Sequence, residues 1–403
     1  GEAATTEGQF FRVPIGTTPE TYTRYQRTAG GSIEAAPLAT TSSLASPSGS
    51  AFIGHSRGGT LGDALNDLYV TPDMFSAVGD GVTPDDLAFE LAKAEGLPIA
   101  LGAKSYALES PFALRTNQEL YGLSHKSTLV GVGPSDTQFI IDTIGFPSAP
   151  INTLVEPVIV DPYVSTIKMA SHANFTIGMS FILHDPVTDM FEVNIVEGFA
   201  ADGQSIITKW PVAQPFPVPA RVLVRRGDFI TNARVCNLRI TGRGGGVRGL
   251  YTDSFTVQDV VLEDLTYIGI AGEASHGASF LRNKVDRVGA SGIGLRVMRQ
   301  ADCIGNKVRR GPQSDESFTA YYNCSHILFA NNQVAQPVFG GGELPAGGAG
   351  NSFLLDTRCS QIAIVNNTAE GSATYQVLVT GSLSGEEPGT FFGCRDIIIE
   401  GNT

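Results

Sequence analysis

The strongest constraint on this chain is an irregular repeat that begins after residue 230. The copies start at Cys236, Gln258, His276, Arg299, Cys324, Cys359 and Cys394. Each copy has two apolar positions separated by one residue, and residues i and i+2 of a strand point to the same side. The first apolar column holds Leu238, Val260, Ala278, Ala301, Ile327, Ile362 and Ile397. The second holds Ile240, Leu262, Phe280, Cys303, Phe329, Ile364 and Ile399.

The spacing of the second column is 22, 18, 23, 26, 35 and 35 residues. A base of roughly 18 to 26 residues with loop insertions suits one coil of a parallel β-helix, in which coils stack ~4.8 Å apart. A leucine-rich repeat is the main alternative, but its L-x-x-L-x-L skeleton is missing. We therefore predict an all-β chain that forms a right-handed parallel β-helix.

A third position of the repeat holds asparagine in the last five copies: Asn283, Asn306, Asn332, Asn367 and Asn402. An amide side chain both donates and accepts, so stacked copies predict a ladder in which each Asn bonds the next. Cys324, Cys359 and Cys394 also recur, 35 residues apart. We interpret them as a small apolar column, because the five cysteines form no C-x-x-C and no Cys/His cluster. No metal site and no cofactor are predicted.

Charge and hydropathy restrict the partners. The formal net charge is −13, which argues against a general nucleic-acid binder, since phosphate affinity comes from Lys and Arg. It leaves room for an anionic glycan held in a local basic groove. No apolar run approaches the ~20 residues that span a membrane, so membrane insertion is not expected.

The first part of the chain predicts a different organisation. Residues 1–50 are rich in Gly, Ser, Thr, Ala and Pro and predict an extended segment, followed by a short helix at "LGDALNDLY". A second helix is expected after Thr83 as N-cap and Pro84 in the first turn, with Leu87, Leu91 and Ala94 as its apolar stripe and Gly96 at its end. We divide the chain into a segment at 1–70 and a β-helix at 71–403, with a β-hairpin insertion at about 165–220. The last residues stop inside a repeat, which predicts further coils beyond residue 403.

The stretch Gly54-His55-Ser56-Arg57-Gly58 spells G-x-S-x-G, the pattern of a hydrolase nucleophile elbow. Such an elbow needs a buried strand before it and βα units around it. Only "AFI" precedes Gly54, after a Ser/Pro/Gly-rich run. We therefore interpret this stretch as a turn into the following helix.

Three segments in a fixed order resemble a known family. "AFIGHSRGGTLGDALNDLY", "FSAVGDGVTPDDLAFELA" and "IALGAKSYAL" are similar to the start of bacteriophage tailspikes and pectate-lyase-like polysaccharide depolymerases. The resemblance covers about residues 50–110, and "GHS" and "LGAKSY" depart from the usual pattern. It implies a trimeric β-helix of the virion tail, with the N-terminal segment as neck and attachment to a tail or baseplate protein. It implies a bacterial surface polysaccharide as ligand, and it carries over no catalytic residue.

Candidate site residues come from the strand before each predicted core strand. These strands read "GLYTD", "GIAGE", "GIGLR", "SFTAY" and "SFLLD", and they end in Asp253, Glu273, Arg296, Tyr321 and Asp356. If they stack in register, the carboxyl groups of Asp253 and Glu273 lie about 5 Å apart, a distance typical of retaining glycosidases. We predict these two as catalytic, and Arg296, Tyr321 and Asp356 as substrate-binding. A solvated strand face is the alternative.

Other candidates are weaker. The loop "RRGPQSDES" contains Arg309, Arg310, Asp315 and Glu316, and Glu343 lies in a glycine-rich loop. His276 and His326 fall in one column or one residue apart, and we interpret both as satisfied polar residues. The main functional hypothesis is a depolymerase, by glycosidic hydrolysis or β-elimination, in which Tyr321 is a base for elimination. The alternatives are a non-catalytic receptor-binding or structural tail protein and a secreted lyase-like enzyme.

Overall fold

The computed structural model describes strands at 10–14, 22–28 and 31–34 and residues 68–403 without 125, 159–164, 189, 213–214, 310–315, 336–350, 357, 371–376 and 381–393. The chain divides into two compact units, Gly1–Tyr69 and Val70–Thr403. In the first unit, β1 (Phe10–Pro14), β2 (Tyr22–Thr28) and β3 (Gly31–Glu34) form an antiparallel sheet. The G-x-S-x-G stretch and residues 61–67 of the first expected helix lie outside the described residues.

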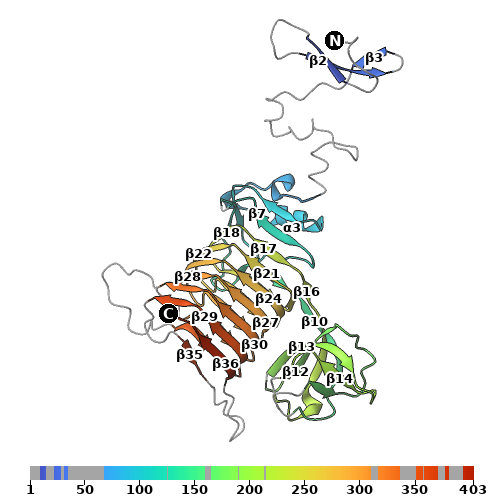
Figure 1. The fold of residues 1–403 in the computed structure, drawn as a ribbon, viewed down its shortest axis with the longest axis vertical. Coiled ribbons are helices and arrows are strands. Elements are labelled where there is room, and N and C mark those ends of the chain that lie inside the picture. Colours follow the sequence, from blue (N-terminus) through green and yellow to red (C-terminus); the bar gives the residue numbers. More distant parts are fainter. Residues whose placement is uncertain are drawn as a thin grey trace. The chain divides into compact units, whose positions relative to one another are not determined.

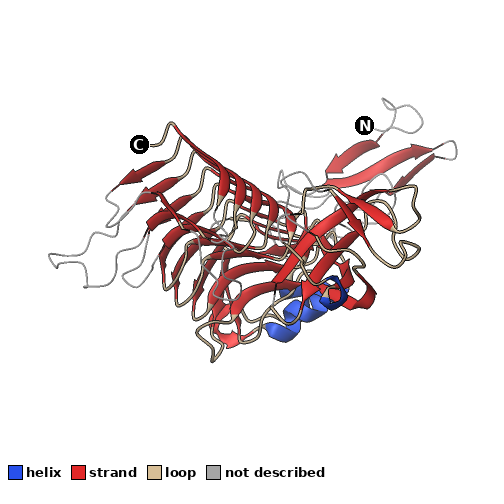
Figure 2. Cartoon of the chain, turned by 90° about the horizontal axis from the view of Figure 1, so that it is seen from below, coloured by secondary structure: helices blue, strands red, loops and turns tan. Residues whose placement is uncertain are grey.

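The second unit is built on three parallel sheets (Figures 1 and 2). Sheet 1 runs through β5 (Ile99–Leu101), β7 (Glu119–Gly122), β17 (Arg234–Cys236), β21 (Thr256–Gln258), β24 (His276–Leu281), β27 (Arg299–Ile304), β30 (Ser325–Ala330), β33 (Ser360–Val365) and β36 (Arg395–Glu400), with β16 (Ile230–Thr231) and β20 (Thr252–Asp253) beside it. Sheet 2 runs through β4 (Asp80–Pro84), β6 (Ser105–Leu108), β8 (Thr128–Gly131), β18 (Arg239–Gly242), β22 (Val261–Leu265), β25 (Lys284–Val288), β28 (Lys307–Arg309), β31 (Gln333–Ala335) and β34 (Thr368–Glu370). Sheet 3 runs through β9 (Phe139–Ile144), β19 (Gly245–Leu250), β23 (Ile270–Glu273), β26 (Ile293–Arg296), β29 (Glu316–Tyr321), β32 (Asn351–Leu355) and β35 (Val377–Val379).

The chain visits the sheets in a fixed order, for example β24, β25, β26 and then β27, which lies directly beside β24. Each circuit is therefore one coil, and the predicted parallel β-helix is confirmed. The core runs along the axis of the coils, where apolar residues from all three sheets form one buried cluster.

The apolar columns are confirmed for the last five copies and wrong for the first two. Phe280 is aligned with Cys303 on the next strand of sheet 1, and the alignment continues through Phe329, Ile364 and Ile399. The preceding partner of Phe280 is Val257, whereas Leu262 pairs with Val285 in sheet 2. Every coil carries an apolar pair on each of three strands, so a pattern of pairs alone does not say which sheet a pair belongs to.

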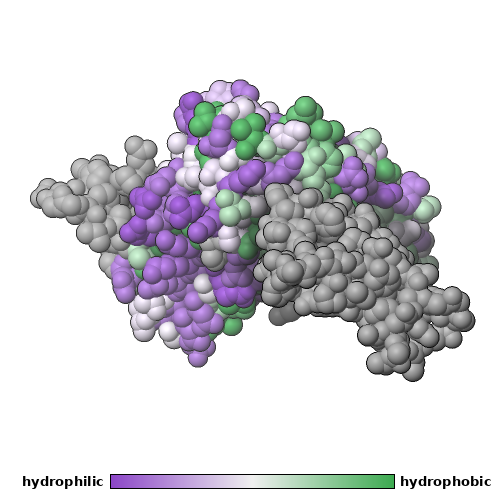
Figure 3. Space-filling model, turned by 90° about the horizontal axis from the view of Figure 1, so that it is seen from above, coloured by the Kyte–Doolittle hydropathy of each residue, from purple (hydrophilic) through white to green (hydrophobic). Residues whose placement is uncertain are grey.

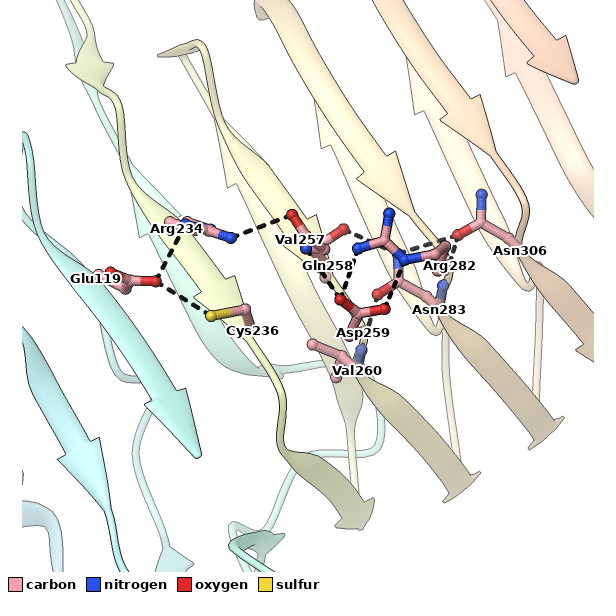
Figure 4. A network of polar contacts seen from close by, with 10 residues as sticks. All are labelled: Glu119, Arg234, Cys236, Val257, Gln258, Asp259, Val260, Arg282, Asn283 and Asn306. Carbon is pink, nitrogen blue, oxygen red and sulfur yellow. Dashed lines mark hydrogen bonds and ion pairs between the residues drawn. The ribbon is translucent and has the colours of Figure 1, made fainter. Parts of the chain in front are cut away.

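The asparagine ladder is present as predicted, and Figure 4 shows its first two members, Asn283 and Asn306. The Nδ2 of Asn283 donates to Oδ1 of Asn306 at 3.0 Å, and the chain continues through Asn332 and Asn367 to Asn402 at 2.9 to 3.0 Å. Each of these five Nδ2 groups also donates to a backbone carbonyl of the preceding coil. The ladder fills the turn from sheet 1 to sheet 2.

An ion pair and a hydrogen bond between neighbouring coils lie beside this turn. Arg282 binds Asp259 through two hydrogen bonds of 2.9 and 2.7 Å, and Arg234 donates to Gln258 at 3.1 Å (Figure 4). Arg282 and Asp259 each have a positive φ, of 52° and 54°. In each of these two coils, the residue at this equivalent position therefore adopts the left-handed backbone conformation, and the chain turns there.

The helix expected after Thr83 is confirmed as α3 (Asp86–Ala94), but its details differ from the prediction. Its N-cap is Asp85, and Leu87 is 74% exposed, while Phe89 is fully buried. The carboxylate of Asp85 accepts hydrogen bonds from the backbone of Val78 and, at 3.2 Å, of Ala107 in β6. These bonds fix the start of the helix and turn Phe89, rather than Leu87, onto the core.

The insertion leaves the β-helix after β9 and forms a six-stranded antiparallel sheet in the order β10 (Phe146–Thr153), β15 (Leu223–Asp228), β12 (Ser180–Asp185), β13 (Met190–Phe199), β14 (Ser205–Thr208), β11 (Thr166–Lys168). It begins before and ends after the 165–220 range expected from the sequence, because β10 and β15 pair with each other. The sheet has its own buried core, which includes Phe181, Val196 and Phe216. The insertion is thus a small domain on the side of the β-helix.

Candidate functional site

The outer face of sheet 3 carries the predicted column. In each strand the core residues alternate with residues that point outward, so Phe318 and Ala320 are in the core and Tyr321 is not. Glu273 is aligned with Arg296, and Arg296 with Tyr321. Asp356 follows Leu355, the partner of Ala320, and therefore comes next. Four of the five predicted residues lie in one column, on four successive coils.

Asp253 does not belong to this column, and its predicted pairing with Glu273 is wrong. The partner of Glu273 on the preceding coil is Leu250. After Leu250 the chain turns at Tyr251, whose φ is 53°, and Asp253 then pairs with His276 at the edge of sheet 1. The sequence alignment missed a corner of three residues. No pair of carboxylates 5 Å apart results from Asp253 and Glu273.

Glu273 has a cationic neighbour instead. The guanidinium of Arg248 binds both oxygens of Asp142 at 2.7 Å, and its Nη1 lies 3.7 Å from Oε2 of Glu273. The hydrogen bonds that Arg248 donates to Asp142 raise the pKa of the guanidinium above its ordinary value. Arg248 also lies over the ring of Phe139, with 5.1 Å between its Cζ and the ring centroid. Glu273 is 24% exposed, so an ion pair with one open side occupies this end of the column.

Tyr321 and Arg296 form the middle of the column. The hydroxyl of Tyr321 donates to Oε2 of Glu316 at 3.3 Å, and Arg296 is exposed with its Cζ 5.3 Å above the ring of Tyr322. Burial, and then the charge of Glu316, raise the pKa of Tyr321. A phenol whose pKa is raised keeps its proton near neutral pH. Tyr321 is therefore a donor, which is the opposite of the base that an elimination would require.

Glu316, a weaker candidate from the loop that follows Val308, is the neighbour of Tyr321. It begins β29 and accepts from both Tyr321 and Ser291. At the far end of the column, Thr380 donates to Oδ1 of Asp356 at 2.6 Å.

Beside the column, the residues of β29 that lie on this outer face are covered and do not reach solvent. Ser317 and Thr319 point away from the core, yet both are fully buried, and their hydroxyl oxygens have no hydrogen-bond partner among the described residues. The reachable part of the face is therefore its edge, along Glu273, Arg296 and Tyr321. Figure 3 shows hydrophilic residues over much of the coloured surface, with hydrophobic residues in separate patches.

The remaining candidates are placed as follows. Arg309 binds Asp286 of the preceding coil and belongs to the structural ion pairs. His276 pairs with Arg299, which pairs with Ser325, so His326 is one residue out of that column. Arg310, Asp315 and Glu343 lie outside the described residues. The described cysteines are free thiols, and the sulfur of Cys359 donates to the carbonyl of Ala320.

Within the described parts of the chain, no group of three or more His, Cys, Asp or Glu side chains is arranged to hold a metal ion. No helix among those residues is long and apolar enough to cross a membrane.

No family model matches the sequence, and no curated protein matches it. The structure is similar to solved phage proteins. The tailspike protein gp49 from Pseudomonas phage LKA1 aligns with a TM-score of 0.60 at 14% identity, over 83% of this chain and 59% of that one. The tailspike gp61 of Pseudomonas phage phi297 aligns with a TM-score of 0.49 at 13% identity, over 83% and 64%. A tailspike of E. coli bacteriophage HK620, solved in complex with a hexasaccharide, aligns with a TM-score of 0.49 at 11% identity, over 90% and 56%.

These similarities concern the fold. The chain spans less than two thirds of the length of each of these three proteins. At 14% identity, the match to the LKA1 tailspike shows a shared architecture of stacked parallel coils. The structural neighbours are mainly phage tailspikes, and the chain has their parallel β-helix fold.

Proposed function

We propose that this chain is part of a phage tailspike that binds a bacterial surface polysaccharide along the outer edge of sheet 3 and cleaves it there. The observation that carries the proposal is the column of Glu273, Arg296 and Tyr321 on adjacent coils. It repeats every ~4.8 Å, which is close to the length of one sugar unit, so a chain of sugars meets a polar group at each step.

The chemistry of each group fits a hydrated, charged sugar chain. Arg296 is exposed and donates in a fork that matches a sugar carboxylate or two neighbouring hydroxyls. Tyr322 lies beneath it and offers an aromatic face. The hydroxyl of Tyr321 donates to Glu316 and so orients that carboxyl group, and a carboxyl group is what protonates the glycosidic oxygen in hydrolysis.

Binding without cleavage is the second candidate, and one observation favours it. Both carboxylates of the column already have protein partners, since Glu273 faces Arg248 and Asp356 accepts from Thr380. A carboxylate that is held in this way is a recognition group rather than a nucleophile. Under this alternative the chain is a receptor-binding component of the tail.

One experiment separates these functions. The purified protein is incubated with capsule and lipopolysaccharide from a panel of bacteria, while bound glycan, new reducing ends and ultraviolet absorbance of unsaturated uronates are measured together. Hydrolysis produces reducing ends without the absorbance, and we expect this result. Both signals together would indicate a lyase and contradict the donor role of Tyr321. Binding without either signal would favour the receptor-binding alternative.

Assembly and location follow the same proposal. We propose that the chain forms a homotrimer on the virion tail and attaches through residues 1–70 to a tail or baseplate protein, as the resemblance of residues 50–110 to tailspikes implies. Sedimentation of the full chain tests whether it is a trimer. Pull-down of tail proteins with the full chain, compared with a variant of this chain that lacks residues 1–70, tests the attachment, and the shortened variant should not bind.

A further inference from the structure

A second cluster of reactive side chains lies where the insertion meets the β-helix. The Oγ of Ser180, at the start of β12, is 2.8 Å from Nε2 of His276 in β24. The Nδ1 of the same ring is 3.2 Å from Oδ1 of Asp253. Serine, histidine and aspartate therefore form one continuous chain of polar contacts, which we call the relay. Ser180 and His276 are 96 residues apart in the sequence.

The protons of this relay are fixed by simple rules. An ionised carboxylate only accepts, so Nδ1 of His276 carries the proton toward Asp253. The other ring nitrogen then accepts, and Ser180 donates to it. Burial acts to raise the pKa of Asp253, but the hydrogen bonds that His276 and Ser254 donate to its carboxylate act in the opposite direction, and the net pKa is below the ordinary value. This is the protonation that a serine nucleophile requires.

The surroundings hold the histidine in place and leave the serine partly open. The ring of His276 is 2% exposed and lies between those of Trp210 and Phe229, at centroid distances of 5.7 and 5.2 Å. Ser180 is partly exposed, and the side chain of Asp253 is 34% exposed. Lys209, over the ring of Trp210, is the cationic neighbour of Asp253.

The insertion is bound to the β-helix by other groups, so the relay is not needed as its only attachment. Ile182 and Val193 of the insertion pack on Ala274 and Val297 of the β-helix. Arg299 forms a buried ion pair with Glu192 at 2.6 Å. These contacts fix Ser180 and His276 relative to each other, which a catalytic pair on two separate elements requires.

We propose that Ser180, His276 and Asp253 form a serine esterase site that removes acyl groups from hydroxyls of the bound polysaccharide. The Oγ of Ser180 attacks the ester carbonyl carbon, and its proton passes to Nε2 of His276. The bond from that carbon to the sugar oxygen breaks, and the oxygen takes the proton from Nε2. Water then gives a proton to Nε2 and attacks the acyl carbon. The bond to Ser180 breaks, and the serine recovers its proton. The products are a carboxylic acid and a free sugar hydroxyl.

The substrate class, an O-acylated saccharide, rests on the proposed function. We choose an ester because a serine nucleophile attacks its carbonyl carbon and its alcohol part can be a sugar hydroxyl. A small acyl group is expected because the rings of Trp210 and Phe229 pack on His276, the neighbour of Ser180. The site lies at the edge of sheet 1, one corner away from the column on sheet 3. A polysaccharide could thus be deacylated and cleaved at separate places on one chain.

The test uses the full chain and three probes. These are an activated acetate ester, an O-acetylated capsular polysaccharide whose released acetate is measured, and a fluorophosphonate that modifies nucleophilic serines. We expect acetate release and a covalent label on Ser180. Ser180→Ala and His276→Asn should each reduce release by roughly 10²-fold or more.

The matched control is His326→Asn, because His326 lies two coils away, near the same Trp210 ring, and outside the relay. It should retain ester hydrolysis. Equal loss in both histidine variants, or no label on Ser180 in the native protein, would overturn the proposal and leave the relay as a structural contact. The same polysaccharide after alkaline deacylation is tested for binding and reducing ends, so a failed esterase is distinguished from a failed glycan-binding function.

Discussion

Removal of one rung of the asparagine ladder should destabilise the protein more than its size suggests. The test is Asn332→Ala in the middle of the ladder. The Oδ1 of Asn332 accepts from the backbone and the side chain of Asn306, at 2.8 and 3.0 Å. Its Nδ2 donates to the carbonyl of Cys303 at 2.8 Å and to Asn367 at 2.9 Å. Asn332 is 2% exposed, so water does not replace these bonds.

The magnitude follows from the groups that lose a partner. The side chains of Asn306 and Asn367 keep other hydrogen bonds, to Phe280 and from the backbone of Asn332. The backbone N–H of Asn306 and the carbonyl of Cys303 lose the bonds that Asn332 supplies. A buried polar group left unpaired costs about 1–3 kcal/mol, so the two groups together predict a loss of about 2–6 kcal/mol.

Urea denaturation measures the loss, with Asn402→Ala as the matched control. Asn402 is partly exposed, so water replaces its bonds and the expected loss is about 1 kcal/mol. Asn332→Asp adds a second test, because a buried carboxyl has a raised pKa and its charged form repels the carbonyl of Cys303. Its stability should be highest below the unfolded pKa of about 3.9 and should fall as the pH rises toward the folded pKa. Equal losses in Asn332→Ala and Asn402→Ala would refute the reasoning.

Three further predictions concern the site and the insertion. Glu192→Ala leaves Arg299 buried without its carboxylate and should cost about 3–5 kcal/mol in the free energy of unfolding, measured with urea. Burial and then Arg299 lower the pKa of His326 below its ordinary 6.5, so stability should fall as the pH drops below 6.5; His326→Asn should flatten that part of the curve of melting temperature against pH. Tyr321→Phe should reduce polysaccharide cleavage by roughly 10²-fold with little change in binding, whereas Asp302→Asn on sheet 1 should change neither.

The sequence predicted the β-helix fold correctly, but it did not always predict which of the three sheets a given strand belongs to. The alignment of Phe280 with Cys303 and the asparagine ladder were predictable because the turn between sheets 1 and 2 has a constant length in those coils. Leu262 was assigned to the wrong sheet because an apolar pair looks the same on every face. Asp253 was assigned to the wrong sheet because β19 ends at Leu250, and the chain then turns at Tyr251 into β20. The left-handed conformation of Tyr251 has no sequence signature.

The relay at the insertion could not be predicted at all. Ser180 and His276 are brought together by packing between a domain and a coil, and neither lies in a motif. Glu316 was visible in the sequence, but only the structure shows that the Tyr321 hydroxyl donates to it. Local period predicts strands, whereas contacts between distant segments depend on the way whole elements pack.

The turn occupied by the asparagine ladder has one more consequence. Successive rungs are separated by 23, 26, 35 and 35 residues, yet the ladder bonds stay between 2.9 and 3.0 Å. All variation in length therefore falls elsewhere, for example between Ala335 at the end of β31 and Asn351 at the start of β32. The turn from sheet 1 to sheet 2 therefore keeps a constant length, whereas other connections between the sheets, such as the one from β31 to β32, vary in length. Such a chain can acquire new binding specificity by exchanging loops while its coils keep the same register.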